Sequence, residues 1–323
     1  MRPFAGSLDR RPRGPTRWLE QEPVTRILFT LYVGMFVVAV RRAQAPWTLA
    51  PAEALALGAG HSLALFGEAR YETLITASFL HTGIVVVALD ALLVSQAGSL
   101  VERAIGSARM APIALAAGAA GNLAAAAHGW AEHASVVITG ATATLAGLLA
   151  AGCVIVWRER DGRGSDAARE AALAPLLRWL AVVFAAGVAA RFTKQDLDPY
   201  ALLGGTLGGA LTGAVWRRSP ASPRAVAASL AGSALVLIGC IAVVAVRDRL
   251  DRFASMPVED RLDFTAGALV DGRCGDAADG LRSLDRLRVP ETSIASLRAQ
   301  VQTSCGRTES QPSVGPPSQR ISP

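Results

Sequence analysis

Long apolar runs separated by short charged stretches repeat along the first 250 residues of the chain. Seven runs are long enough to be membrane-spanning helices, because about 20 apolar residues cross the hydrocarbon core of a bilayer. We expect these spans at about residues 24–40, 74–97, 111–127, 135–157, 172–190, 200–216 and 226–246. The connection after the first span contains several prolines and glycines and is predicted to lie at the membrane interface. The pattern therefore predicts an all-α, polytopic membrane protein.

The two ends of the chain follow other patterns. Residues 247–306 hold three short amphipathic segments whose apolar side chains are expected to share a small core. Both termini are polar and rich in proline, which is typical of disordered tails. We therefore divide the chain into five parts: a cytoplasmic tail (1–23), a six-helix membrane domain (24–218), a seventh span (225–246), a small helical domain (247–306) and a second tail (307–323).

The distribution of arginine predicts the orientation of the chain. The protein has 32 Lys and Arg residues, 26 Asp and Glu residues and a net charge of +6. Arginines gather in the N-terminal tail and in the connections after spans two, four and six, whereas the connection after span three has neither Lys nor Arg. Arg41 and Arg42, after span one, are an exception. Because positively charged loops remain in the cytoplasm, we expect a cytoplasmic N-terminus and an extracytoplasmic 247–306 domain.

Composition also limits the partners and cofactors. No segment interleaves basic with aromatic residues, so we expect membrane lipid and no nucleic acid as a partner. Cys274 and Cys305 flank the small helical domain, and in an oxidising compartment we expect them to form a disulfide, with two free cysteines as the alternative. His128 and His133 lack an acidic cluster beside them, so no metal site is predicted, and no cofactor.

Small residues recur at helical spacing in the fourth and sixth spans. Such residues let two helix backbones approach closely, because no side chain stands between them. The sequence therefore predicts that span six is seated tightly against span four. The residues expected to make this contact are Ala143, Gly147, Ala151, Gly204, Gly205, Gly208 and Gly209.

Four segments, in this order and spacing, resemble the rhomboid family of intramembrane serine proteases. They are residues 74–83 (LITASFLHTG), 96–109 (QAGSLVERAIGSAR), 140–151 (GATATLAGLLAA) and 198–209 (DPYALLGGTLGG). The resemblance spans about residues 27–218 and implies a rhomboid-like six-helix bundle, here followed by a seventh helix. Lys194 is the only lysine, which indicates a GC-rich bacterial genome and hence the bacterial inner membrane.

The resemblance breaks down at the residues that family members use for catalysis. They cut peptide bonds with a serine on the fourth helix and a histidine on the sixth, and these positions are Thr142 and Leu202 here. The oxyanion-stabilising histidine and asparagine of the second helix are replaced by Val86 and Asp90. Leucine cannot accept a proton, and a hydroxyl without a base is a poor nucleophile. An ionised carboxylate would also repel a developing oxyanion.

These substitutions predict a rhomboid-like pseudoprotease that binds transmembrane segments of client proteins without cutting them. Asp90, Gly140 and Thr142 are the candidate client-binding residues. We expect Asp90 to face the bundle interior, either as a contact for a bound helix or ion or as a hydrogen-bond partner of a nearby threonine or backbone group. The alternative is an active intramembrane serine-type endopeptidase, which needs a base beside Thr142. A transporter would need inverted repeats, which we do not find.

Overall fold

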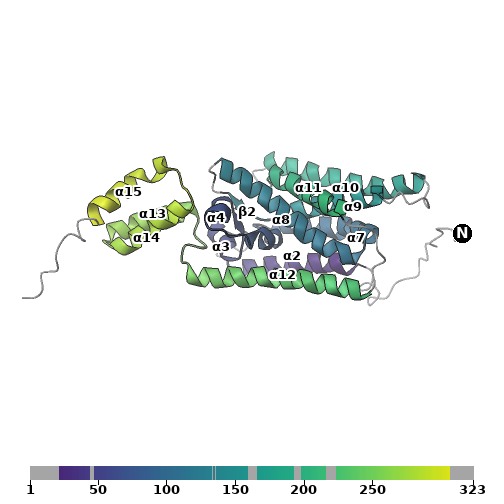
Figure 1. Cartoon of the computed structure of the whole chain (residues 1–323), viewed down its shortest axis with the longest axis horizontal. Coiled ribbons are helices and arrows are strands. Elements are labelled where there is room, and N and C mark those ends of the chain that lie inside the picture. The colour runs from purple at the N-terminus through teal and green to yellow at the C-terminus, as the bar shows by residue number, and fades with distance from the viewer. Residues whose placement is uncertain are drawn as a thin grey trace, which may run out of the picture.

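The structure, a computed structural model, is built almost entirely of helices (Figure 1), which confirms the all-α prediction. It describes residues 22–43, 47–132, 134, 136–158, 166–192, 198–215 and 223–305. The predicted N-terminal tail up to residue 21 and the tail from residue 306 lie outside this described part. The long helices are α2 (Pro23–Val40), α6 (Ile84–Leu93), α7 (Ser99–Ile105), α8 (Ser107–Ala131), α9 (Thr142–Arg158), α10 (Asp166–Phe192), α11 (Pro199–Val215) and α12 (Pro223–Leu250). A π-helical turn, η2 (Val94–Gly98), joins α6 to α7.

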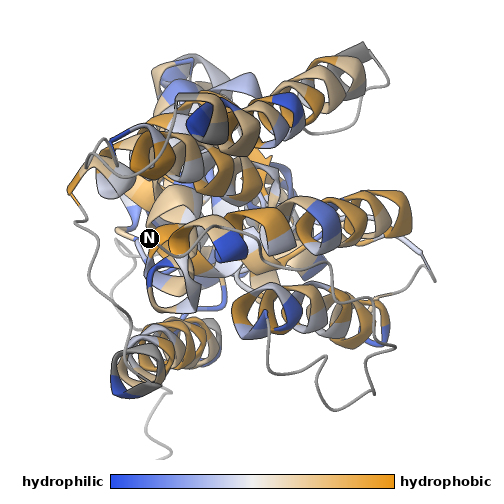
Figure 2. Ribbon diagram, turned by 90° about the vertical axis from the view of Figure 1, so that its right-hand side faces the viewer, coloured by the Kyte–Doolittle hydropathy of each residue, from blue (hydrophilic) through white to orange (hydrophobic). Residues whose placement is uncertain are grey.

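Five stretches of the described chain are long and apolar enough to cross a membrane. They are Pro23–Val40, Ile84–Ile105, Ser107–Ala131, Arg169–Ala189 and Ala227–Arg247. The other two predicted spans form α9 and α11, each of 17 residues, or about 26 Å of helix, near the lower limit for spanning a bilayer. Hydrophobic residues continue onto the outward faces of the helices, as lipid contact requires (Figure 2).

The second and fourth spans begin later than predicted. Residues 73–79 form two short helices, α5 (Thr73–Thr76) and η1 (Ala77–Phe79), and the long helix starts only at Ile84. Before the fourth span, β2 (Val137–Ile138) pairs antiparallel with β1 (Gly60–His61), and Gly140 has a φ of +107°. Both segments are apolar because protein buries them, and their backbone bonds go to neighbouring segments. An apolar segment has the same sequence pattern whether protein or lipid surrounds it.

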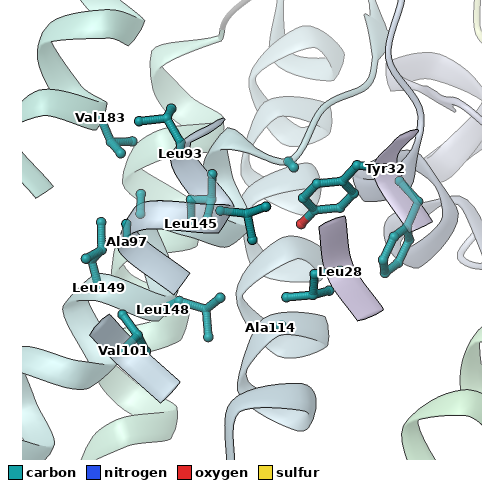
Figure 3. Close-up of a cluster of buried hydrophobic side chains, with 14 of the residues drawn as sticks. Leu28, Tyr32, Leu93, Ala97, Val101, Ala114, Leu145, Leu148, Leu149 and Val183 are labelled. Carbon is teal, nitrogen blue, oxygen red and sulfur yellow. The ribbon is translucent and has the colours of Figure 1, made fainter. Parts of the chain in front are cut away.

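The bundle core is formed where α2, α6, α7, α8 and α9 meet (Figure 3). Leu145, Leu148 and Leu149 of α9 are buried against residues from the other helices. Tyr32 of α2 is fully buried and points its hydroxyl into this cluster. α9 is therefore the central helix of the membrane domain, and α12 lies along its outside, with little of its surface buried.

The glycines of α11 serve two different neighbours. Gly205 and Gly209 lie so close to the backbone of α9 at Ala143 and Gly147 that a Cβ on either would overlap it, and Gly213 lies nearly as close to Ala151. Gly204 and Gly208 instead face α8, at Ala124 and Ala120. The prediction that all these glycines face span four was therefore wrong for Gly204 and Gly208. α11 therefore packs between two helices, on backbone atoms of α9 and on the small alanine side chains of α8.

A buried carboxylate fixes the start of α2. Glu102 of α7 is 3% exposed and accepts hydrogen bonds from the backbone N–H groups of Val24 (3.0 Å) and Thr25 (2.8 Å). The Thr25 hydroxyl donates to the same carboxylate at 2.7 Å. The first N–H groups of a helix have no partner within the helix, and here a side chain 77 residues away supplies one.

The C-terminal helices α13 (Val258–Val270), α14 (Cys274–Arg286) and α15 (Glu291–Cys305) are packed against one end of the bundle (Figure 1). Cys274 and Cys305 form a disulfide that ties α14 to α15. The predicted shared core exists in part, because Leu269, Leu281, Leu297 and Val301 pack together. Leu284, Leu287 and Ile294 belong to a second cluster, which includes Leu63 and Ala64 of α4 (Ser62–Gly67). The three helices therefore share part of their core with the connection between α2 and α6.

An ionic network reinforces this contact. Arg261 of α13 is 1% exposed and reaches both carboxylate oxygens of Glu68, at 2.7 and 3.4 Å. It also donates to the backbone oxygens of Phe253 (2.6 Å) and Met256 (3.0 Å). Arg70 donates to the backbone oxygen of Ala254. A buried charge is costly without its partner, so the Arg261–Glu68 pair favours one arrangement of α13 against the chain that follows α4.

Protonation of His61 is expected to weaken the same region. His61 Nδ1 accepts the N–H of Ala64 at 3.1 Å, which caps α4. Burial, followed by the charges of Arg261 and Arg70, lowers the pKa of His61 to about 4. The folded state thus favours the neutral ring, and between pH 6.5 and pH 4 the unfolded chain binds the proton more readily. We expect the free energy of unfolding to fall by about 3 kcal/mol from pH 7 to pH 4.

Denaturant unfolding in detergent micelles at several pH values measures this effect. Other groups titrate in the same range, so the informative quantity is the difference between wild type and His61→Asn, a variant that keeps a capping oxygen but does not titrate. The difference should grow as the pH falls below 6.5. Parallel curves for the two proteins would show that His61 does not carry the effect.

Candidate functional site

The site predicted at the start of α9 is occupied by a closed hydrogen-bond network. Thr142 Oγ1 donates to Asp90 Oδ1 at 3.1 Å. The other carboxylate oxygen accepts the Ala141 N–H at 3.2 Å and lies 3.1 Å from His81 Nε2. All four residues are buried. Asp90 therefore joins α6 to the first turn of α9 and to the segment that precedes α6.

Asp90 is a hydrogen-bond partner of a nearby threonine and of a backbone group, which is one of the two roles expected for it from the sequence. It has the nearby threonine and backbone partner that a carboxylate inside a membrane protein requires. The sequence did not reveal His81 as the third partner of Asp90, because the two residues are nine positions apart and the chain between them includes a turn whose path the sequence does not specify. His81 and Asp90 both fell inside the predicted span 74–97, whereas the structure places them on either side of the start of α6 at Ile84.

The positions of the missing catalytic residues are filled by packing side chains. Leu202 of α11 is 3% exposed and lies against Gly187 of α10, where a Cβ would overlap its Cδ1. Val86 is half-buried on α6. Among the described residues, the hydrogen-bond partner of the Thr142 hydroxyl is Asp90, and no imidazole contacts that hydroxyl. The structure thus brings a carboxylate, rather than an imidazole, to the position of a base.

Two buried polar atoms near the network have no hydrogen-bond partner within the described chain. They are the Tyr32 hydroxyl and His81 Nδ1. The two rings meet edge to face, with centroids 5.4 Å apart. Buried polar atoms are usually satisfied by protein or by ordered water. The Tyr32 hydroxyl and His81 Nδ1 are therefore exceptions to this rule within the described chain.

A cavity of about 360 Å³ opens in front of Thr142. Its walls come from the end of α8, residues 136–143 and the start of α11. Of the predicted client-binding residues, Gly140 and Thr142 line the cavity, whereas Asp90 lies behind Thr142. Leu202 and Ala143 form part of the apolar lining. The cavity is large enough for a few side chains of a bound segment.

The mouth of this cavity was not anticipated from the sequence. His128 and Tyr200 stack there, with ring centroids 3.7 Å apart, and His128 Nε2 lies 3.0 Å from Glu132 Oε1. Asp198 also lines the cavity, and it caps α11 by accepting the Tyr200 N–H. His133 lies outside the described residues. Within the described chain, no group of three or more His, Cys, Asp or Glu residues is placed to hold a metal ion.

The fold and this site define a polytopic helical membrane protein with a cavity enclosed by its central helices. Residues 68–219 match the family model of the Rhomboid domain. The chain therefore belongs to the rhomboid family, and the matched part runs from the end of α4 past the end of α11. No curated protein matches the chain in sequence.

Proposed function

We propose that this rhomboid-family protein is a pseudoprotease, which holds transmembrane segments of client proteins without cutting them. The observation that carries the proposal is the hydrogen bond from Thr142 Oγ1 to Asp90, together with the buried Leu202 at the histidine position. A proton shuttle must accept the nucleophile's proton and then deliver it to the leaving amine. Leucine does neither, and Asp90 is already committed to Ala141 and His81.

The retained scaffold supports client binding. The close packing of α11 on α8 and α9 persists, and it keeps the cavity in front of Thr142 open at one end of the bundle. A client helix that unwinds near the membrane surface would place its exposed backbone and a few side chains in this cavity. Small residues such as Gly140 and Ala143 leave room for that backbone.

The arginine distribution supports a bacterial inner-membrane location with the N-terminus in the cytoplasm. In that orientation α13–α15 and the cavity mouth both lie on the extracytoplasmic side, because both are at the same end of the bundle. A cation–π contact joins the α13–α15 domain to α8, since the Arg288 guanidinium lies 5.2 Å from the centroid of the Trp130 ring. An oxidising compartment there suits the Cys274–Cys305 disulfide.

One observation favours a second candidate, an active endopeptidase. Asp90 is within hydrogen-bond reach of the Thr142 hydroxyl, as a general base for that nucleophile would be. Against it, a carboxylate held beside the attacked carbonyl raises the energy of the developing oxyanion. The two candidates differ in a property that is simple to measure.

A cleavage assay on the full-length protein in liposomes separates them. The substrate is a labelled single-span peptide, and the proteins are wild type, Thr142→Ala and Asp90→Asn. We expect that wild type binds the peptide, as seen by energy transfer between labels, and that none of the three cleaves it. Removing both nucleophile and base costs on the order of 10⁶ in rate in serine proteases. Cleavage by wild type that is lost in both variants would establish the endopeptidase instead.

A further inference from the structure

We propose that the cavity mouth binds an arginine or lysine side chain of the client segment, an inference that rests on the function proposed above. The chain has a net charge of +6. Yet the described residues that line the cavity include two carboxylates, Glu132 and Asp198, and no lysine or arginine. A concave site lined by one sign of charge attracts ligands of the opposite sign.

The two carboxylates come from different helices and are held in place. Glu132 follows the last turn of α8, and its Oε1 lies beside His128. Asp198 precedes α11, and its Oδ1 accepts the Tyr200 N–H at 2.8 Å. Within the described chain, each has its second carboxylate oxygen left for a ligand. Two carboxylates at one opening suit a single cationic group that forms charge-assisted hydrogen bonds.

The stacked rings add an aromatic surface at the same opening. His128 covers one face of the Tyr200 ring, and the rings are nearly parallel, at 19°. Tyr200 remains 43% exposed, so part of its ring is available to a ligand. Guanidinium and ammonium groups are attracted to aromatic rings, and a planar guanidinium also stacks on them.

A buried acceptor inside the cavity points independently to a donor-rich ligand. Asn122 is 2% exposed and lines the cavity. Its amide nitrogen donates to the Leu74 backbone oxygen (2.8 Å) and to Ser78 Oγ (2.9 Å), neither of which lines the cavity. The Leu74 oxygen needs a donor, which fixes the orientation of the amide. The Asn122 side-chain oxygen is left without a partner in the described chain, and N–H groups of a basic ligand would satisfy it.

The experiment compares two peptides on the full-length protein in nanodiscs of zwitterionic lipid. Both peptides are the same labelled single-span helix, and one carries an arginine at the end facing the cavity where the other carries citrulline, its neutral isostere. We expect the arginine peptide to bind roughly fivefold to tenfold more tightly, as partly exposed charge and aromatic contacts allow. Added salt should reduce this ratio.

A double variant, Glu132→Gln with Asp198→Asn, tests the residues. Each substitution keeps an oxygen for the existing contact, so the His128 contact and the α11 cap survive. We expect the arginine preference to disappear in this variant but to persist in Glu259→Gln, which changes an exposed carboxylate on α13. A preference that survives the double variant overturns the inference. Equal binding of the two peptides by wild type also overturns it but leaves client binding intact, whereas binding of neither peptide overturns both.

Discussion

Replacing Gly209 by alanine is expected to destabilise the membrane domain more than any other single methyl group added to α11. The new Cβ would lie 2.5 Å from Gly147 Cα, and closer still to the Gly147 backbone oxygen. These are backbone atoms, so no side-chain rotation relieves the overlap and the two helices must separate. Overpacking of a tight core costs about 1–3 kcal/mol, and we expect the upper end of that range or more. Unfolding in mixed detergent micelles measures it.

Two further glycines make a graded series with Gly209. At Gly213 the nearest atom to a new Cβ is Ala151 Cα at 2.9 Å, so Gly213→Ala should cost less. Gly239 of α12 has nothing within 4 Å of the added carbon, so Gly239→Ala should cost nothing or stabilise slightly, because alanine favours helix. If all three variants unfold at the same detergent fraction, then α9 and α11 are not packed backbone to backbone.

Replacing Arg261 by methionine is expected to loosen α13–α15 from the bundle. The change leaves the Glu68 carboxylate, 7% exposed, without its cationic partner and deprives several backbone oxygens of their donor. Breaking a buried ion pair by removing one partner costs about 3–5 kcal/mol. Hydrogen exchange should therefore quicken throughout α13–α15, and thermal unfolding should begin in this region.

The matched control for this change is Arg298→Met. Arg298 of α15 pairs with Asp285 and Glu291, but all three side chains are substantially exposed. Exposed pairs contribute about 0–1 kcal/mol, so this variant should exchange like wild type. A double change of Arg261→Met with Glu68→Leu should recover part of the loss, since no unpaired charge remains. Equal behaviour of the two single variants would show that the Arg261–Glu68 pair does not hold the domain in place.

Much of the fold could be predicted because its main signal is local. Seven apolar runs correspond to seven long helical segments, and the three amphipathic segments to α13–α15. The predicted boundaries are wrong where apolar residues are buried by other parts of the protein and do not lie in a membrane-spanning helix. Residues 74–83 and 136–141 pack against α8 and the 47–63 segment, and no sequence pattern distinguishes that environment from lipid. The packing of α13–α15 on α4 was missed for a related reason. The spacing of Leu284 and Leu287 predicts that one face of α14 is buried, but it does not say which segment covers that face.

The candidate site was predictable in its residues but not in its connections. The substitutions at Thr142 and Leu202 could be read from one family motif each, and the one at Asp90 from the second helix, which follows the motif at residues 74–83. The contact between Asp90 and His81 could not, because it depends on the turn that precedes α6. The acidic mouth of the cavity could not be predicted either, since Glu132 and Asp198 lie 66 positions apart in the chain and line one cavity only because α11 packs on α8.

The capping of α2 by Glu102 has a consequence for how the protein is made. The N-cap residue of α2, Glu22, makes no capping hydrogen bond with its side chain, and the carboxylate that caps the helix leaves the ribosome 77 residues after Thr25. Until then, the first N–H groups of α2 must remain hydrated or bonded to lipid headgroups. The first turn of α2 therefore gains its capping partner only after α7 has been synthesised.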